Sequence, residues 1–283
     1  MRDALGRDVD QLRISLTQRC NLTCPYCHRE GQSHARHEAE AEHFAAMVRE
    51  AVRHGVRRVK LTGGEPLMRR DICDIIRSIK AVRGIREVSM TTNGALLPRL
   101  AFQLKEAGLD RVNIGCDSLT RGALQKHRGL ALPAVRAAKR AGLTPIKLNM
   151  VVLRDANTHA LEGMLQFAQE TGCTLQLIEL INTDAPYYAR HFVPLQLLEE
   201  RLAAQAERVQ QRKLHNRRVY WLKGTRVEVV AASREDFCAG CRRMRITSLG
   251  EWKPCLRRQD NHLPASEGYL AALALRGRGG ALV

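Results

Sequence analysis

Three cysteines within eight residues constrain the fold and the chemistry of this chain more than any other feature. Cys20, Cys24 and Cys27, which we call the first triplet, are separated by three and then by two residues, and Tyr26 directly precedes the last of them. Residues 12–16 alternate between apolar and polar side chains, which predicts a half-buried strand just ahead of the cysteines. We therefore expect the first triplet on a loop that leaves a strand, where α/β folds commonly carry their chemistry.

The spacing of the first triplet favours an iron–sulfur cluster over other uses of cysteine. Three thiolates can hold three irons of a four-iron cluster and leave the fourth iron open for another ligand. Zinc is the main alternative, but a structural zinc site normally takes four ligands in paired cysteine or histidine groups. A disulfide network does not fit, because three is an odd number and no secretory signal precedes the loop.

The composition predicts a cytoplasmic protein and fits an anionic partner. Apolar residues make up 45% of the 283 residues, enough for one large domain or for a domain with an appendage. No apolar run approaches the roughly 18 residues of a membrane span, so no membrane association is expected. The net charge of +17 fits a nucleotide, a nucleic acid or an acidic protein as partner, or arginines spread over solvated helix faces, and charge alone does not choose between these. Only 4% of the residues are aromatic, which argues against a base-stacking nucleic-acid surface.

Strands and helices are predicted to alternate through the first 182 residues. The alternation is typical of parallel βα units, and six units are too few to close an eightfold barrel. The expected fold class is therefore α/β, a partial (β/α)6 TIM-type barrel with its site at the C-terminal ends of the strands. The predicted strands cover residues 12–16, 56–61, 87–90, 111–114, 146–153 and 175–180. The predicted helices cover residues 36–54, 71–82, 97–107, 132–141 and 160–171, the fourth with Pro133 in its first turn.

The alternation stops near residue 182, which predicts a barrel domain over residues 1–182 and a smaller C-terminal domain over residues 183–283. An amphipathic helix is expected at 194–209, a basic polar segment at 210–218, a short strand at 227–230 and a mobile tail at 275–283. Cys238, Cys241 and Cys255 form a second triplet. By its spacing alone, this triplet fits a zinc site completed by a histidine such as His262, or a second four-iron cluster. The remaining cysteines, Cys73, Cys116 and Cys173, have apolar neighbours and are expected in the core.

Residues 63–66, with the sequence Gly-Gly-Glu-Pro, follow the second predicted strand. The glycines allow a close backbone approach to a ligand, and Glu65 can accept a hydrogen bond from an ammonium group. Together with the first triplet, this segment resembles the radical S-adenosylmethionine (radical SAM) superfamily. The resemblance implies S-adenosylmethionine as cofactor and a [4Fe–4S] cluster on the first triplet. It also implies the cofactor-binding residues Tyr26, Gly64, Glu65, Asn93, Gly115 and Ile181.

The second triplet carries a more specific resemblance. The run Cys238-x-x-Cys241-x-Arg243-x-Arg245, followed by a glycine and by Pro-Cys255-Leu, resembles the C-terminal cluster motif of the GTP 3′,8-cyclases, the MoaA family of molybdenum cofactor biosynthesis. Residues 27–31 and 214–218 look most like the archaeal members. The resemblance implies a second [4Fe–4S] cluster on Cys238, Cys241 and Cys255, whose open iron holds the guanine.

The same resemblance implies a reaction of the carbon–carbon lyase class. A 5′-deoxyadenosyl radical takes the 3′ hydrogen of GTP, and the resulting carbon radical attacks C8 of guanine to give 3′,8-cyclo-7,8-dihydro-GTP. Guanidinium groups pair with phosphate through two hydrogen bonds, which suits a triphosphate substrate. The implied catalytic residues are Cys20, Cys24, Cys27, Arg243 and Arg245. The positions that match the family's GTP contacts are Arg13, Arg58, Lys60, Thr91, Lys147, Arg243 and Arg245.

Three positions and the C-terminal tail depart from the family pattern. Gln176 stands where an arginine is usual, Gly115 where a serine commonly contacts the cofactor, and Ile181 where a methionine is usual. Gly279 and Gly280 resemble the catalytic Gly-Gly tail of many bacterial members, but three residues follow them. A flexible tail is the alternative for that segment.

Two other functions stay open on the sequence alone. One is a two-cluster radical SAM enzyme that acts on a peptide or on a different nucleotide, and the other is a nucleic-acid-binding iron–sulfur protein. The expected partners of a cyclase are GTP, an electron donor such as ferredoxin or flavodoxin, and cyclic pyranopterin monophosphate synthase as the downstream enzyme. A homodimer is one alternative for its assembly.

Overall fold

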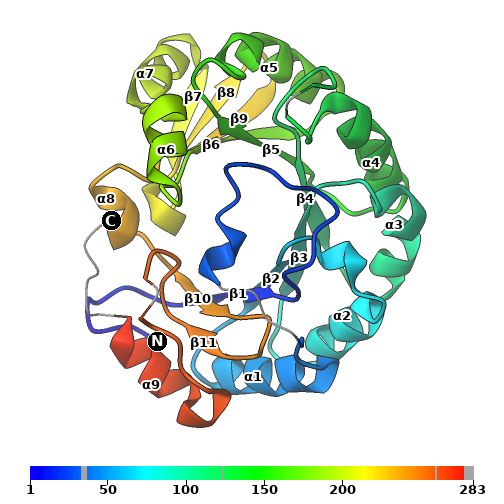
Figure 1. Ribbon diagram of the computed structural model, residues 1–283, viewed down its shortest axis with the longest axis vertical. Helices are drawn as coiled ribbons and strands as arrows, with labels where there is room; N and C mark the ends of the chain where they lie inside the picture. The colour runs from blue at the N-terminus through cyan, green and yellow to red at the C-terminus, as the bar shows by residue number, and fades with distance from the viewer. Residues whose placement is uncertain (33–36, 123, 259, 277–283) are drawn as a thin grey trace.

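The computed structural model describes residues 1–32, 37–122, 124–258 and 260–276. Its centre is a run of six parallel strands in chain order, each hydrogen-bonded to the next. The run curves into an arc with helices on its outer side (Figure 1). The expected α/β partial barrel is therefore confirmed. The strands are β1 (Gln11–Ser15), β2 (Arg58–Thr62), β3 (Glu87–Thr92), β4 (Arg111–Gly115), β5 (Lys147–Val152) and β6 (Thr174–Glu179).

The helices between these strands form because each has one apolar side to bury. In α2, for example, Ile72, Ile75, Ile76 and Ile79 recur at helical spacing and are all buried. Full burial of one such side chain contributes about 1.5–3 kcal/mol. The five helices on the outside of the arc are α1 (Ala41–Arg53), α2 (Ile72–Lys80), α3 (Leu97–Glu106), α4 (Arg128–Arg140) and α5 (Leu161–Glu170).

The C-terminal third of the chain extends the sheet at both ends. β9 (Thr225–Val230) pairs in parallel with β6 and is followed outward by two antiparallel strands, β8 (Arg218–Leu222) and β7 (Arg208–Gln211). At the opposite end, β10 (Arg243–Ile246) pairs in parallel with β1, and β11 (Trp252–Lys253) pairs antiparallel with β10. The result is one eleven-stranded sheet in the order β11-β10-β1-β2-β3-β4-β5-β6-β9-β8-β7.

Several predicted element bounds are wrong. The fourth barrel helix begins at Arg128 and not at residue 132, because the His127 side chain caps it by accepting from the Gly129 amide; Pro133 therefore lies inside the helix. The first helix begins at Ala41. The expected helix at 194–209 is shorter, α7 (Gln196–Gln205), because residues 208–211 pair with β8 as a strand.

Other elements were not predicted at all. They are β7, β8, β10, β11, α6 (Ala185–His191), α8 (Asp236–Ala239) and α9 (Gly268–Leu275), the last of which lies beside α1 (Figure 1). Leu275, the first residue of the expected tail, closes α9, and residues 277–283, with Gly279 and Gly280, lie outside the described residues.

Alternation along the strands separates a helix-facing core from a polar interior. Successive strand residues point to opposite faces. Leu12 and Ile14 of β1 are fully buried in the core, whereas Arg13 between them lines a cavity inside the arc. Lys60 of β2 takes the equivalent position, opposite Arg13 in the β1–β2 pairing. The inner face of the sheet is therefore built from charged and polar side chains.

Candidate active site

The first triplet borders an open cavity of about 700 Å³, which we call the outer cavity. Cys20 and Cys27 are exposed, Cys24 is half-buried, and all three thiols are free. The cysteine loop follows β1 and lies over the middle of the arc (Figure 1). Three free thiols that face a space of this size fit a four-iron cluster, which occupies the volume between its ligands.

The Gly-Gly-Glu-Pro turn supports the cysteine loop by backbone contact. The Gly64 amide donates to the Thr17 carbonyl at 2.7 Å, and the Glu65 amide donates to the Arg19 carbonyl at 2.8 Å. A Cβ atom at Gly64 would lie 2.3 Å from the Arg19 carbonyl oxygen, so only glycine fits there. Gly64 therefore lets this turn approach the backbone of the cysteine loop closely.

Glu65 and Asn93 join the end of β3 to the same loop. Glu65 is buried, and its carboxylate accepts from the Thr92 hydroxyl at 2.8 Å and from the Asn93 amide at 2.7 Å. Burial raises the pKa of Glu65 above its usual value. The Asn93 side chain donates to Asn21 Oδ1 at 2.8 Å and lies 3.9 Å from the Cys20 sulfur.

Tyr26, predicted to contact the cofactor, anchors the loop from inside. Its hydroxyl donates to Asp117 and accepts from Lys126 Nζ at 3.0 Å. Although burial lowers the pKa of Lys126, Asp117 and the three cysteines of the first triplet hold it above the usual value. Gly115 explains how this lysine reaches the loop, since a Cβ atom there would lie 2.5 Å from Lys126 Cδ. The serine that is usual at this position would collide with Lys126.

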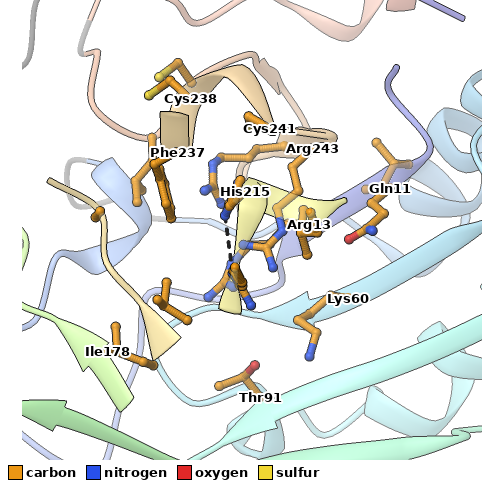
Figure 2. A pocket seen from close by; sticks show the side chains of 18 of the residues that line it. Gln11, Arg13, Lys60, Thr91, Ile178, His215, Phe237, Cys238, Cys241 and Arg243 are labelled. Carbon is orange, nitrogen blue, oxygen red and sulfur yellow. Dashed lines mark hydrogen bonds between the residues drawn. The ribbon is translucent and has the colours of Figure 1, made fainter. Parts of the chain in front are cut away.

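A second cavity, of about 370 Å³, lies inside the arc of strands, and we call it the inner cavity. Figure 2 shows Arg13, Lys60, Thr91 and Arg243 around one space, with Cys238 and Cys241 at one end of it. The structure thus brings Arg13 of β1, the first strand, together with Arg243 of β10 in the C-terminal third of the chain. All predicted nucleotide contacts and all predicted second-cluster ligands line this cavity: Arg13, Arg58, Lys60, Thr91, Lys147, Arg243, Arg245, Cys238, Cys241 and Cys255.

Two buried carboxylates hold most of the cations in place. Glu30 accepts from Arg13 at 2.6 Å and from Arg245 at 3.4 Å. Burial alone would raise the pKa of Glu30, but Arg13, His28 and Arg245 hold it well below its usual value. Glu228, which is fully buried on β9, pairs with Lys147 and lies 3.0 Å from each of Arg212 and Arg217. Its pKa is likewise lowered by these three cations, against the effect of burial.

Arg243 and Lys60 have no carboxylate partner within ion-pair distance among the residues that the structure describes. Lys60 donates only to Asn113 Oδ1, at 3.0 Å. Burial lowers the pKa of both groups well below the usual values, and nearby cations, among them Arg13, lower it further. Arg58 differs, because it pairs with Asp10 and is partly exposed. The inner cavity therefore carries uncompensated positive charge, which an anion would neutralise.

A third cavity, of about 1200 Å³, shares lining residues with each of the other two. It shares Pro25 and Cys27 with the outer cavity, and Ile181 and Arg257 with the inner cavity. Ile181, predicted to contact the cofactor, therefore lies between the two cysteine triplets.

His262 is not placed to complete a zinc site with the second triplet. His262 lies 2.9 Å from Lys253 Nζ through one ring nitrogen and 3.4 Å from Glu251 through the other, and it does not line the inner cavity. Within the described residues, no three His, Cys, Asp or Glu side chains are placed to chelate a single ion. Three thiols that border a cavity fit a four-iron cluster, as at the first triplet.

Sequence reasoning missed Glu30, Lys126, Arg217 and Glu228. Glu228 had a usable signal, because a carboxylate flanked by Val227 and Val229 in a predicted strand requires a buried cation as partner. The other three lie in loops or at an element end, where no periodic pattern marks them.

Comparison with known proteins completes the description. Residues 14–168 match the family profile described as Radical SAM superfamily, and residues 173–266 match the one described as Molybdenum Cofactor Synthesis C. A probable GTP 3′,8-cyclase of Methanosarcina acetivorans is 42% identical over 280 residues, which cover 94% of this chain and 83% of that one. The chain belongs to the GTP 3′,8-cyclase family of radical SAM proteins. A second cyclase, from Pyrococcus horikoshii, is 42% identical over 272 residues and covers 92% and 87% of the two chains.

Solved structures share the fold of this cyclase family member. Streptococcus suis SuiB bound to S-adenosylmethionine has a TM-score of 0.69 at 16% identity, over 93% of this chain and 64% of SuiB, less than two thirds of that protein. The protein anSMEcpe with bound AdoMet has a TM-score of 0.68 at 17% identity, over 95% and 81% of the two chains. No helix in the described parts of the chain is long and apolar enough to cross a membrane.

Proposed function

We propose that this chain converts GTP to (8S)-3′,8-cyclo-7,8-dihydroguanosine 5′-triphosphate, the first step of molybdenum cofactor biosynthesis. The observation that carries the proposal is the inner cavity, where Arg243 and Lys60 lie beside the second triplet with no carboxylate partner among the described residues. A triphosphate is the part of GTP that such a set of cations binds best. A peptide substrate has no comparable use for these side chains.

The chain's own residues then have separable tasks. The first triplet would hold one [4Fe–4S] cluster, which with bound S-adenosylmethionine supplies a carbon-centred radical able to take a hydrogen atom. Arg13, Lys60, Arg243 and Arg245 bind the triphosphate and thereby fix the ribose at one depth in the cavity. The second triplet would hold the second cluster and, through it, the guanine.

Further parts of the proposal concern partners and organisation. A donor of the ferredoxin or flavodoxin type reduces the first cluster, and the product passes to cyclic pyranopterin monophosphate synthase in the cytoplasm. Residues 1–182 form the radical-generating unit, and residues 183–283 supply the second cluster and part of the nucleotide site.

The test is an anaerobic incubation of reconstituted protein with dithionite, S-adenosylmethionine and GTP deuterated at C3′. The product has lost the deuterium and is an isomer of unlabelled GTP, so it is one mass unit lighter than the labelled substrate, and chromatography separates it from any unlabelled GTP. We expect deuterium to appear in 5′-deoxyadenosine and a new nucleotide to form in parallel. Unlabelled 5′-deoxyadenosine with unchanged GTP would rule out the proposed reaction.

A further inference from the structure

Arg217 lies at the side-chain end of Gln176, the position at which the resemblance to the cyclase family implies an arginine. Gln176 faces the inner cavity from β6, directly opposite Glu228 in the β6–β9 pairing. Arg217 enters from another element, between the short helical turn Leu214–Asn216 and the start of β8. Its Nη1 lies 3.0 Å from Glu228 Oε1 and 3.4 Å from Gln176 Oε1. A guanidinium group therefore occupies this region although the strand residue is a glutamine.

Arg217 has unused hydrogen-bonding capacity that points to a ligand. Its side chain is only 7% exposed and lines the inner cavity. Nη1 serves Glu228 and Gln176, and Nη2 contacts His215 Nδ1 at 3.3 Å. The buried Nε has no hydrogen-bond partner among the described residues. Nε and Nη2 form one edge of the guanidinium, and such an edge binds two oxygens of a phosphate in parallel.

The loop that carries Arg217 is fixed to the second cysteine motif. The His215 amide donates to the Gly240 carbonyl at 2.6 Å, between Cys238 and Cys241. The His215 ring packs against Phe237 with ring centroids 4.1 Å apart. His215 has a backbone φ of 56°, a left-handed conformation that costs free energy in a non-glycine residue and that these contacts stabilise. The geometry thus couples the position of Arg217 to the second triplet.

The charge balance around Arg217 also requires an anion. Glu228 pairs with three cations and Glu30 with two. Arg243 and Lys60 have no carboxylate partner among the described residues. These seven cations and two carboxylates leave a formal excess of five positive charges. A nucleoside triphosphate brings about four negative charges at neutral pH, a close match.

We propose that Arg217 is a triphosphate-binding residue that takes over the role of the usual β6 arginine, with Glu228 as the residue that positions it. The inference rests on the proposed function, since it assigns a contact within the GTP site. Arg217 directly precedes β8, and the second triplet follows β9. The proposed phosphate contact and the proposed guanine-binding cluster therefore come from the same C-terminal part of the chain.

The test compares GTP and guanosine binding to anaerobically reconstituted protein by calorimetry, without reductant. Arg217→Ala should weaken GTP binding about ten- to a hundred-fold, because one charged contact is lost. Guanosine, which has no triphosphate, should bind within about threefold of wild type. The double variant Gln176→Arg/Arg217→Ala should recover most of the GTP affinity. Because Lys147 and Arg212 still pair with Glu228 in Arg217→Ala, no buried carboxylate is left alone.

Arg218→Ala is the matched control. Arg218 is the next residue, its side chain is 49% exposed, and its nearest carboxylate is Glu199 at 4.0 Å. This variant should bind both ligands as wild type does. Equal weakening of GTP and guanosine by Arg217→Ala, or unchanged GTP binding, would overturn the inference while leaving the cyclase function intact. A wild-type protein with no preference for GTP over guanosine would instead overturn both. If Arg217→Ala fails to fold, Arg217→Gln, which keeps a polar group beside Gln176, decides by the same comparison.

Discussion

Arg13 and Arg245 lie directly opposite each other in the parallel pairing of β1 with β10, and both guanidinium groups donate to Glu30. Two arginines side by side would repel each other, and the buried carboxylate between them removes that repulsion. Glu30 comes from the cysteine loop, 215 residues before Arg245. One carboxylate therefore joins the first strand, the first cluster loop and a C-terminal strand at the wall of the inner cavity.

We expect Glu30→Gln to destabilise the ligand-free protein and to increase its stabilisation by GTP. The amide keeps the shape but leaves Arg13 and Arg245 without a counter-charge, and breaking a buried ion pair in this way costs about 3–5 kcal/mol. Chemical denaturation measures the free energy of unfolding, and thermal melts with and without GTP measure the second effect. Glu42→Gln, on an exposed pair with Arg49, is the control and should change stability by less than about 0.5 kcal/mol. Similar changes in the two variants would show that Glu30 does not balance the cavity.

The two cysteine triplets should have separable functions. Iron and sulfide analysis of the reconstituted protein should give about eight of each per chain. Cys24→Ala should abolish cleavage of S-adenosylmethionine, whereas Cys241→Ala should lose the nucleotide product and keep some uncoupled cleavage. Cys73→Ala, on α2 and remote from both triplets in the sequence, should retain full iron content. Release of 5′-deoxyadenosine at the wild-type rate by Cys24→Ala would remove this cysteine from its assigned role.

We expect Arg243 to contribute to GTP binding and to lower the stability of the ligand-free protein. It is buried without a carboxylate partner among the described residues, so Arg243→Met should raise the free energy of unfolding by about 1–2 kcal/mol. The same change should weaken GTP binding by about 1.5–3 kcal/mol and guanosine binding much less. Calorimetry with both ligands and denaturation of the ligand-free protein provide the two measurements. Loss of stability together with equal weakening of both ligands would show that Arg243 supports the cluster loop.

GTP binding should take up a proton at Lys147 in mildly basic solution. Burial, opposed by Glu228, lowers the pKa of Lys147 from 10.5 to about 7, so the amine is largely neutral in the free protein at pH 8.5. A bound triphosphate favours the charged form, and its terminal phosphate, with a pKa of about 6, is already ionised. Calorimetry in buffers of different ionisation enthalpy counts the protons. Lys147→Arg, which stays charged, should reduce the uptake by about one proton, and equal uptake in both proteins would contradict this assignment.

The same shift has a defined effect on stability. Between pH 7 and 10.5 the unfolded state binds more protons at Lys147 than the folded state does. The contribution of this group to the free energy of unfolding therefore rises with pH across that window and is constant below it.

The barrel could be predicted from the sequence because its helices and strands carry their own periodic patterns. The four Ile residues of α2 and the alternation around Arg13 are local signals that need no knowledge of the partner. β10 also alternates, but its place beside β1 depends on a pairing across most of the chain, and its arginines drew attention as part of a cysteine motif. β7 is exposed along its whole length and lacks an apolar pattern. β8 carries an apolar run at residues 219–222, but its pairing with β7 and β9 could not be read from that run alone.

The same contrast between local patterns and long-range contacts applies to the predicted nucleotide site. Arg13, Lys60 and Lys147 stand at inward strand positions and could be placed from the motif and the alternation. Glu30 at this site and Lys126 at the cysteine loop could not, because both lie in loops whose course depends on backbone turns and on glycines such as Gly115. Their roles are set by the charges and the space around them, which only the folded chain reveals.

The pairing of β1 with β10 has a consequence for the order in which the protein is made. β1 leaves the ribosome early, and one of its edges can pair with β2 soon afterwards. The other edge stays unpaired until residues 243–246 have been made, and an unpaired strand edge readily pairs with other chains. Until then Arg13 and Lys60 face water, and no nucleotide site exists. Translation that stalls before β10 would thus yield a chain that has its first cysteine loop but cannot hold a substrate for it.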